Sequence, residues 1–148
     1  MSTTDVGGFA RQLGIVFTKE TKDRVEGTMP IDSSKFQPWG FVHGGCTISF
    51  LESLASRAAE MNADLDNERP FGVDVHVKHK KPGQKGMMTG YAELDHIERN
   101  KQFWTVVALD DEGDTISDGV IITKIVTLAR LEEKERERQA AKAAQSGE

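Results

Sequence analysis

The chain has little cysteine, no long hydrophobic run and no excess of basic charge. One cysteine among 148 residues cannot form an intrachain disulfide and leaves no cysteine-rich zinc site. The apolar runs fall far short of the roughly 20 residues that a membrane-spanning helix needs. A net charge of −5 lacks the basic excess that a general nucleic-acid binder requires. These absences exclude disulfide scaffolds, membrane-spanning proteins and general nucleic-acid binders.

The length and the two ends of the chain predict one cytoplasmic domain with a tail. Residues 1–8 contain no basic segment followed by an apolar stretch, so we expect no secretory signal. Residues 131–148 mix acidic and basic side chains with few apolar ones. We therefore predict a domain over residues 8–130. The charged tail over residues 131–148 is expected to be helical or disordered. If the tail has a function, we expect it to be an oligomerisation or docking arm.

The spacing of apolar residues predicts one long helix among strands. Apolar side chains recur at helical spacing from His43 to about Asn62. The other segments have strand patterns bounded by turn-forming residues. The predicted strands are Leu13–Thr18, Arg24–Pro30, Val73–Val77, Met87–Ile97, Phe103–Leu109 and Thr115–Ala129. Two strands, a helix and four strands predict an α+β architecture with a largely antiparallel sheet.

The start of the predicted helix concentrates the residues with chemical potential. Gly44 and Gly45 bring backbone N–H groups to the positive end of the helix dipole, where they can stabilise an oxyanion. Glu52 lies about two turns further on, on a helix stripe with Ser49 and Ser56, whose hydroxyls can orient it. Taken singly, such residues are also typical of a tight turn and a solvated helix. Together with the element order, they favour an acyl-transfer site.

At these residues the chain resembles a known family, the hotdog-fold acyl-CoA thioesterases of the 4-hydroxybenzoyl-CoA and phenylacetate-pathway type. The resemblance covers about residues 9–128 and includes the segments FVHGGCTISFLESLASRAAE and VDVHVKHKKPGQKG. Its most specific part is His43-Gly-Gly followed by Glu52, nine positions after the histidine. The resemblance implies a hotdog fold, in which an antiparallel sheet wraps around one long helix. It also implies a homodimer or homotetramer, with active sites built by two subunits.

The same resemblance implies a role for each matching residue. Gly44 is expected to donate its backbone N–H to the thioester carbonyl, and Glu52 to act as nucleophile or general base. Gln37, upstream of the helix, and Ser56, one turn after the acid, are expected to assist. The family often has threonine at the position of Ser56, and serine keeps the hydroxyl. His43 is expected to shape the loop and the helix start rather than to transfer protons.

The implied substrate is an acyl-CoA with an aromatic or a medium- to long-chain acyl group. The resemblance implies no metal and no redox cofactor, since coenzyme A enters as part of the substrate. Its phosphates need nearby cations, and we select Lys81, Arg99 and Lys101, for which a solvated strand end is the alternative interpretation. Gly45 and Trp39 complete the predicted substrate-binding set, although Trp39 can equally pack its loop.

Other residues carry weaker signals. Asp74 and His76 share one strand face, but two ligands without a third are better explained as a polar outer face than as a metal site. His79 and His96 are isolated and are assigned no role. Cys46 is interpreted as a small packing residue.

Two other functions remain open within the same fold. One is a non-catalytic acyl-CoA-binding or regulatory protein, which keeps the helix start but shows no turnover. The other is a hydratase or dehydratase acting on acyl thioesters, which needs a histidine base with an acidic partner in a different motif.

Overall fold

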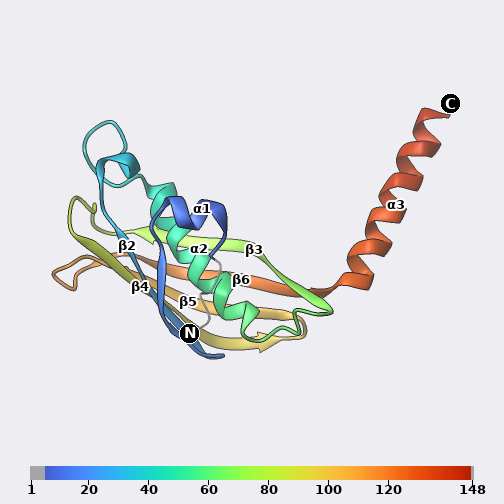
Figure 1. Ribbon diagram of the computed structural model, residues 1–148, viewed down its shortest axis with the longest axis horizontal. Coiled ribbons are helices and arrows are strands. Elements are labelled where there is room, and N and C mark those ends of the chain that lie inside the picture. Colours follow the sequence, from blue (N-terminus) through green and yellow to red (C-terminus); the bar gives the residue numbers. More distant parts are fainter. Residues whose placement is uncertain (1–5, 148) are drawn as a thin grey trace.

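The computed structural model describes residues 6–147 (Figure 1). Its six strands form one antiparallel sheet in the order β1-β2-β4-β5-β6-β3, which leaves β1 and β3 at the edges. The elements are α1 (Gly7–Gln12), β1 (Val16–Glu20), β2 (Arg24–Pro30), a 3₁₀ turn (Ser33–Lys35), α2 (Gly44–Glu60), β3 (Glu68–His79), β4 (Met87–Glu98), β5 (Lys101–Leu109), β6 (Thr115–Thr127) and α3 (Leu128–Ser146).

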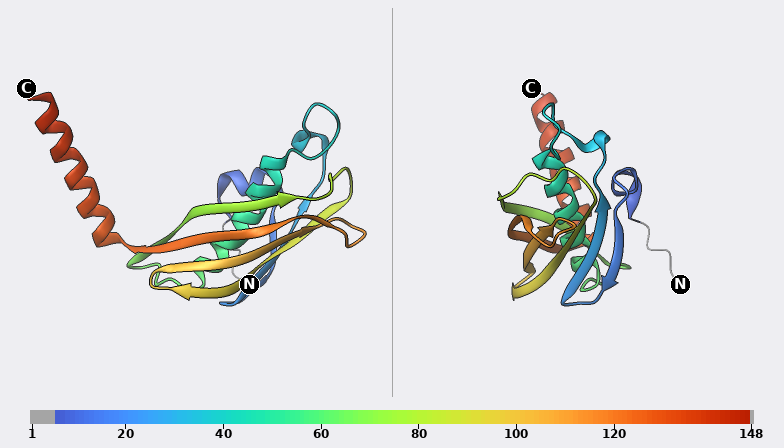
Figure 2. Two further views of the ribbon diagram at one scale, coloured as in Figure 1. Left: turned by 180° about the vertical axis from the view of Figure 1, so that it is seen from behind. Right: turned by 90° about the vertical axis from the view of Figure 1, so that its left-hand side faces the viewer.

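The sheet curves around α2, as the end-on view in Figure 2 shows. The helix buries one apolar face completely, through Phe50, Leu51 and Leu54 together with small alanines. Each large side chain of this kind contributes roughly 1.5–3 kcal/mol of burial free energy. On the sheet side, Trp104 is fully buried against this face, and its indole N–H donates to Thr123 at 2.8 Å. The predicted α+β hotdog architecture is confirmed.

Strand β3 presents its two faces to different surroundings. Paired residues of antiparallel strands share a face, and Gly72 and Val75 pair with Thr123 and Ile121 of β6, which are buried in the core. Val73 is an extra residue at a β-bulge between Gly72 and Asp74. The helix-facing residues of β3 are therefore Gly72, Val75, Val77 and His79. Asp74, His76 and Lys78 lie on the outer face, as the alternation predicts.

The N-terminal part of the domain differs from the sequence-based prediction. Residues Gly7–Gln12 form α1, and the first strand begins at Val16 rather than at Leu13. Leu13 and Gly14 end the helix instead, with their N–H groups donating to carbonyls of α1 and Gly14 at φ +73°. A helix of 6 residues that opens with two glycines has too few turns to show a helical period.

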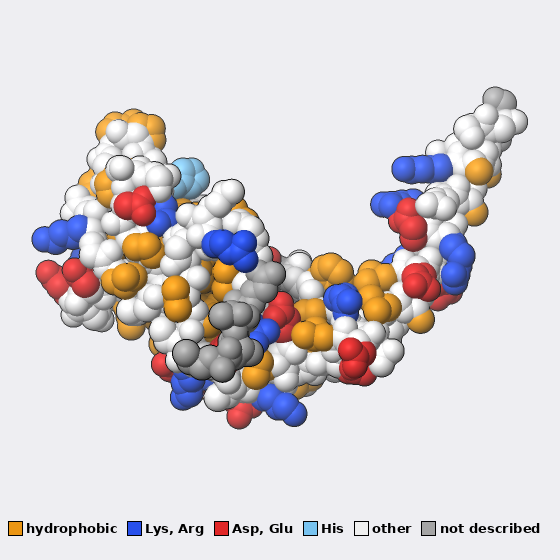
Figure 3. Space-filling model, viewed as in Figure 1, with side chains coloured by type: hydrophobic (Ala, Val, Ile, Leu, Met, Phe, Trp, Pro, Cys, Tyr) orange, Lys and Arg blue, Asp and Glu red, His pale blue; other side chains and the backbone are white. Residues whose placement is uncertain are grey.

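The C-terminal segment is a helical arm. Thr127 caps α3 by accepting a hydrogen bond from the Arg130 N–H at 3.1 Å, so the helix begins three residues before the predicted boundary at 131. None of its described residues is buried. Figures 1 and 3 show the arm standing clear of the domain with acidic and basic side chains along it. No helix within residues 6–147 is long and apolar enough to cross a membrane.

Candidate active site

The start of α2 opens into a cleft of about 350 Å³. The loop before the helix contributes Gln37, the helix itself contributes Gly44, the end of β3 contributes His79, and the following loop contributes Lys81. Three of the predicted site residues are thus brought together by segments far apart in the sequence.

The first turn of α2 leaves one backbone N–H group available. His43 is the N-cap, and its Nδ1 accepts a hydrogen bond from the Gly45 N–H at 2.9 Å. The His43 carbonyl accepts from the N–H groups of Cys46 and Thr47. Within residues 6–147, the Gly44 N–H has no such acceptor. Because His43 accepts hydrogen bonds from the N–H groups of the next three residues after Gly44, the Gly44 N–H is the donor that remains at the positive end of the helix dipole.

The loop before α2 is ordered by the side chain of Gln37. Its Oε1 accepts hydrogen bonds from the N–H groups of Trp39 at 2.5 Å and Phe41 at 3.5 Å. With the carbonyl oxygen used by the loop, the amide nitrogen is the remaining polar group of this side chain. Trp39 is 78% exposed and lines neither the cleft nor the groove beside Glu52, in contrast to its predicted place in the substrate site.

A buried lysine holds the other end of this loop. Lys35 is 5% exposed, and its ammonium donates to the Pro30 carbonyl and to Asp32, each at 2.8 Å. The hydrogen bond from Lys35, together with one from Ser34, lowers the pKa of Asp32 to about 2. The Lys35 carbonyl in turn accepts from the His43 N–H at 2.8 Å. The cap of α2 is therefore tied to a fixed ion pair.

Glu52 lies in a different cavity of the same chain. It borders a groove of about 280 Å³ beneath α1, which Ser56 and the aromatic side chains of Phe9 and Phe17 also line. Its carboxylate lies against Gly72 of β3, where any Cβ atom would collide with it. Glu52 is about 12 Å from Gly44 along the helix axis, whereas reacting atoms must approach to about 3–3.5 Å. One chain alone does not bring the two together.

The hydroxyl neighbours of Glu52 behave differently from one another. The Ser49 hydroxyl donates to the Gly45 carbonyl at 2.8 Å, so the prediction that it orients Glu52 is wrong in this arrangement. Ser56 lines the groove one turn after Glu52. Gly45 faces a third cavity beside Cys46, outside the cleft, and burial raises the pKa of the Cys46 thiol.

The predicted cationic residues do not form one group. The Lys81 ammonium lies at the cleft and donates to Asp110 at 2.7 Å and Asp114 at 2.8 Å. A separate pocket is bordered by Arg99, in the β4–β5 turn, and by Lys101, the first residue of β5. Lys101 pairs with the same β6 residue as does Phe71 of β3, so this turn is at the Gly72 end of the sheet. It is far from the cleft within its own chain.

His79 is a site residue that sequence reasoning missed. Its ring lies beside Gly44, where an added Cβ atom would come within 2.8 Å of Nε2. Its Nδ1 is 2.7 Å from the hydroxyl of Ser117, which is completely buried, so the orientation of the ring is fixed. The sequence signal for it was the alternation of Val75 and Val77, because the next residue on the same face of the strand is the polar His79.

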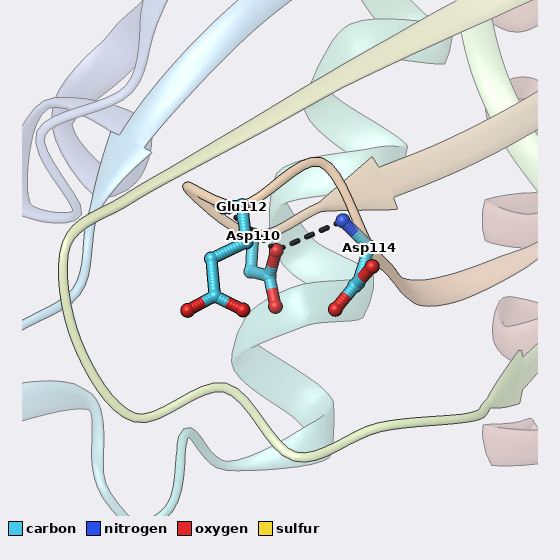
Figure 4. A group of neighbouring side chains, drawn as sticks. All are labelled: Asp110, Glu112 and Asp114. Atoms are coloured by element: carbon cyan, nitrogen blue, oxygen red, sulfur yellow. Dashed lines mark hydrogen bonds between the residues drawn. The ribbon is translucent and has the colours of Figure 1, made fainter.

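The candidate metal ligands are not those considered from the sequence. Asp74 and His76 pair with each other at 3.0 Å on the exposed outer face. Within residues 6–147, one group of three carboxylates has oxygen atoms within 4.8 Å of one another, at Asp110, Glu112 and Asp114 (Figure 4). Oxygen ligands of this kind suit a hard cation. Here, however, the Lys81 ammonium already bonds to two of the three.

Comparisons with known proteins find relatives in sequence and in fold. The family model described as the thioesterase superfamily matches residues 40–117. The proofreading thioesterase EntH of Cronobacter sakazakii is 32% identical over 113 residues, which cover 76% of this chain and 82% of that protein. A mutant thioesterase from Pseudomonas aeruginosa superposes with a TM-score of 0.78 and 26% identity, covering 82% of this chain and 88% of the other. A thioesterase from Haemophilus influenzae superposes with a TM-score of 0.76 and 25% identity, covering 82% and 85%.

Proposed function

Since the chain belongs to the thioesterase superfamily and is a thioester hydrolase, we propose that it hydrolyses an acyl-CoA to the free acid and coenzyme A. The acyl group is aromatic or of medium to long chain length. The observation that carries the proposal is the available Gly44 N–H, at the positive end of α2 in a cleft shared with Gln37 and His79. The reaction needs an oxyanion donor, a base and water, so we propose that it uses no metal or redox cofactor.

The proposed chemistry divides between Gly44 and Glu52. The thioester carbonyl oxygen accepts hydrogen bonds from the Gly44 N–H and the Gln37 amide, which stabilise the oxyanion as it develops. Glu52 removes a proton from water, the water oxygen bonds to the carbonyl carbon, and the C–S bond breaks as the sulfur leaves and takes up the proton. Alternatively, the Glu52 carboxylate attacks the carbonyl carbon, the C–S bond breaks as the coenzyme A thiolate leaves, and water then hydrolyses the resulting anhydride. Ser56 lies one helical turn away and can orient the carboxylate.

A complete site requires a second copy of the chain, because Glu52 and Gly44 are too far apart within one. The open edge of β3 supports pairing, since it exposes the apolar side chains of Phe71, Val73 and Val75 to between 36% and 49%. Two β3 strands can pair antiparallel across a two-fold axis, which joins the two sheets into one.

The charges of β3 favour one register for this pairing. An axis at His76 puts Val75 opposite the partner's Val77 and Asp74 opposite the partner's Lys78, so that both contacts are complementary. Because Val73 is an extra residue at the bulge, the same register puts Gly72 opposite the partner's His79. Glu52, which lies on Gly72, is then level with the partner's Gly44. The β4–β5 turn, with Arg99 and Lys101, also approaches the partner's cleft, where its cations can bind phosphate.

A charge exchange tests this register. Asp74→Lys replaces two symmetric attractions by repulsions, and we expect the dimer to dissociate about tenfold more readily. The double variant Asp74→Lys/Lys78→Asp should restore the wild-type dissociation constant, measured by sedimentation at low ionic strength. Asp95→Lys, the same exchange at an exposed site on β4, is the matched control and should leave dimerisation unchanged. A double variant that dissociates like the single one would contradict the register.

A panel of acyl-CoAs, assayed with a thiol-reactive chromophore, tests the function itself. Hydrolysis releases free coenzyme A, whereas a hydratase alters the acyl group without releasing a thiol, and a binding protein retains the intact thioester. The N-acetylcysteamine thioester of each acid, which lacks the nucleotide and its phosphates, serves as the control substrate. We expect a higher kcat/KM for the acyl-CoA. Equal values would argue against recognition of coenzyme A.

A further inference from the structure

The loop between β3 and β4, residues 80–86, lines the cleft and is hydrogen-bonded to the segment that precedes α2. Its Gly83 carbonyl accepts a hydrogen bond from the Val42 N–H at 2.9 Å, and its Gly86 carbonyl accepts from the Ile31 N–H at 2.9 Å. Val42 stands two residues before Gly44. Any displacement of this loop therefore reaches the N–H group that is proposed to polarise the substrate.

The β5–β6 hairpin, residues 110–114, holds the same loop from its other side. At one end of the loop, the Lys81 ammonium donates to Asp110 at 2.7 Å and to Asp114 at 2.8 Å. At the other end, the side chain of Asp111 packs on Gly86, which has φ +82° and leaves no room for a Cβ atom. The hairpin thus contacts the loop at two separate points.

Asp110 bonds to its own hairpin through one carboxylate oxygen and to the loop through the other. Oδ1 accepts the N–H groups of Glu112 at 3.0 Å and Asp114 at 2.9 Å, the second of which is drawn in Figure 4. Oδ2 accepts the Lys81 ammonium, and the Asp110 side chain is only 11% exposed. This hydrogen bond from Lys81 holds the pKa of Asp110 below its usual range. This carboxylate therefore ties the hairpin to the loop.

We propose that the Asp110–Lys81 ion pair is a positioning device that sets the Gly44 N–H in place through the 80–86 loop and Val42. The inference rests on the proposed role of Gly44. It also reassigns Lys81 from the phosphate-binding set to the positioning of the cleft. A phosphate at this ammonium would lie beside the carboxylates of Asp110, Glu112 and Asp114, all within 4.0 Å of it, which repel an anion.

Asp110→Asn is the first test. The amide keeps an oxygen for the hairpin N–H groups but turns its NH2 group toward Lys81, which removes the Asp110–Lys81 ion pair and leaves the ammonium bonded to Asp114 alone. We expect kcat to fall about tenfold, because a misplaced donor group loses much of its effect. The loss should be equal for an acyl-CoA and for its N-acetylcysteamine thioester, with KM changed less than about twofold for each.

Variants of Lys81 make the test specific. Lys81→Met should lose as much kcat as Asp110→Asn, and the two changes together should lose no more than either one. Lys81→Arg keeps the cation and should retain most of the activity. Glu112→Gln is the matched control, because this carboxylate is 71% exposed and 4.0 Å from the ammonium. It should leave kcat within about twofold of wild type.

If Lys81 bound a phosphate of the substrate instead, Asp110→Asn should improve the use of acyl-CoA rather than impair it. Asp110→Asn would then remove one of the two carboxylates that bond to the ammonium and lower KM for the acyl-CoA alone, leaving KM for the N-acetylcysteamine substrate unaffected. Either that result or an unchanged kcat would overturn the proposal. Thermal melting of each variant, followed by circular dichroism, shows whether activity was measured on folded protein.

Amide hydrogen exchange gives a readout that does not depend on catalysis. In Asp110→Asn, exchange of the Val42 N–H should accelerate, because the loop that carries the accepting Gly83 carbonyl has lost the Asp110 contact and is held less firmly. Unchanged exchange at Val42 would overturn the positioning role. If the proposed function is wrong, the result is distinct: the wild-type protein hydrolyses no acyl-CoA, but the Val42 N–H still exchanges faster in Asp110→Asn than in wild type.

Discussion

The Glu52→Gln variant is expected to lose about 10³- to 10⁴-fold in kcat while remaining folded. Glutamine has the shape of glutamate, so it fits the space against Gly72 of β3 without new contacts. Its amide, however, neither accepts the proton of water nor attacks a carbonyl carbon. A kcat measurement on an acyl-CoA, with the melting temperature determined in parallel, checks both halves of the expectation.

Glu60→Gln is the matched control for this variant. Glu60 lies on the same helix, borders the same groove and accepts a hydrogen bond from Arg57 at 2.7 Å. The substitution weakens a half-exposed ion pair. Because such pairs contribute at most about 1 kcal/mol to stability, kcat should stay within a few-fold of wild type. Wild-type turnover by Glu52→Gln would remove Glu52 from the mechanism.

Gly44→Pro is expected to lower kcat by about 10²- to 10³-fold, the effect of deleting one oxyanion donor. Gly44 is the first residue of α2, the helical position where proline is tolerated best because its missing N–H has no partner within the helix. His43 has φ −59° and ψ 131°, a conformation that a following proline allows. The substitution therefore removes the proposed donor without breaking the helix.

Gly44→Ala separates the N–H group from the added carbon. Alanine and proline both place a Cβ atom near the His79 ring, 2.8 Å from the present position of Nε2, so the ring must shift in each variant. Alanine keeps the N–H, and its kcat should stay within about tenfold of wild type and well above that of the proline variant. Equal losses in the two variants would assign the effect to His79 instead of the donor.

The helical period and the strand alternation predicted most of the fold because each element buries a continuous face. The long helix with its apolar face of Leu51, Leu54 and Ala55 follows directly from that spacing. The α1 helix was missed because its single amphipathic turn and its glycines show no period. The bulge at Val73 changes which residues face the helix, and no local pattern marked it.

The site was predictable where its residues are close in sequence and not where the fold brings them together. His43, Gly44 and Glu52 share one motif, so their relation is fixed by the helix. His79 reaches Gly44 only through the packing of β3 on α2, and its signal was a single polar residue on an apolar face. Lys81 meets Asp110, 29 residues later, through a hairpin whose position no local spacing encodes.

The central claim is that each active site takes Gly44 from one chain and Glu52 from another, and mixing two inactive variants tests it most directly. Glu52→Gln and Gly44→Pro are unfolded together, refolded as a mixture and assayed for thiol release. In a mixed dimer, one site receives the intact Gly44 of the first chain and the intact Glu52 of the second. Random pairing then restores about one quarter of the wild-type activity. Activity that stays at the level of the two parent variants would contradict the shared site.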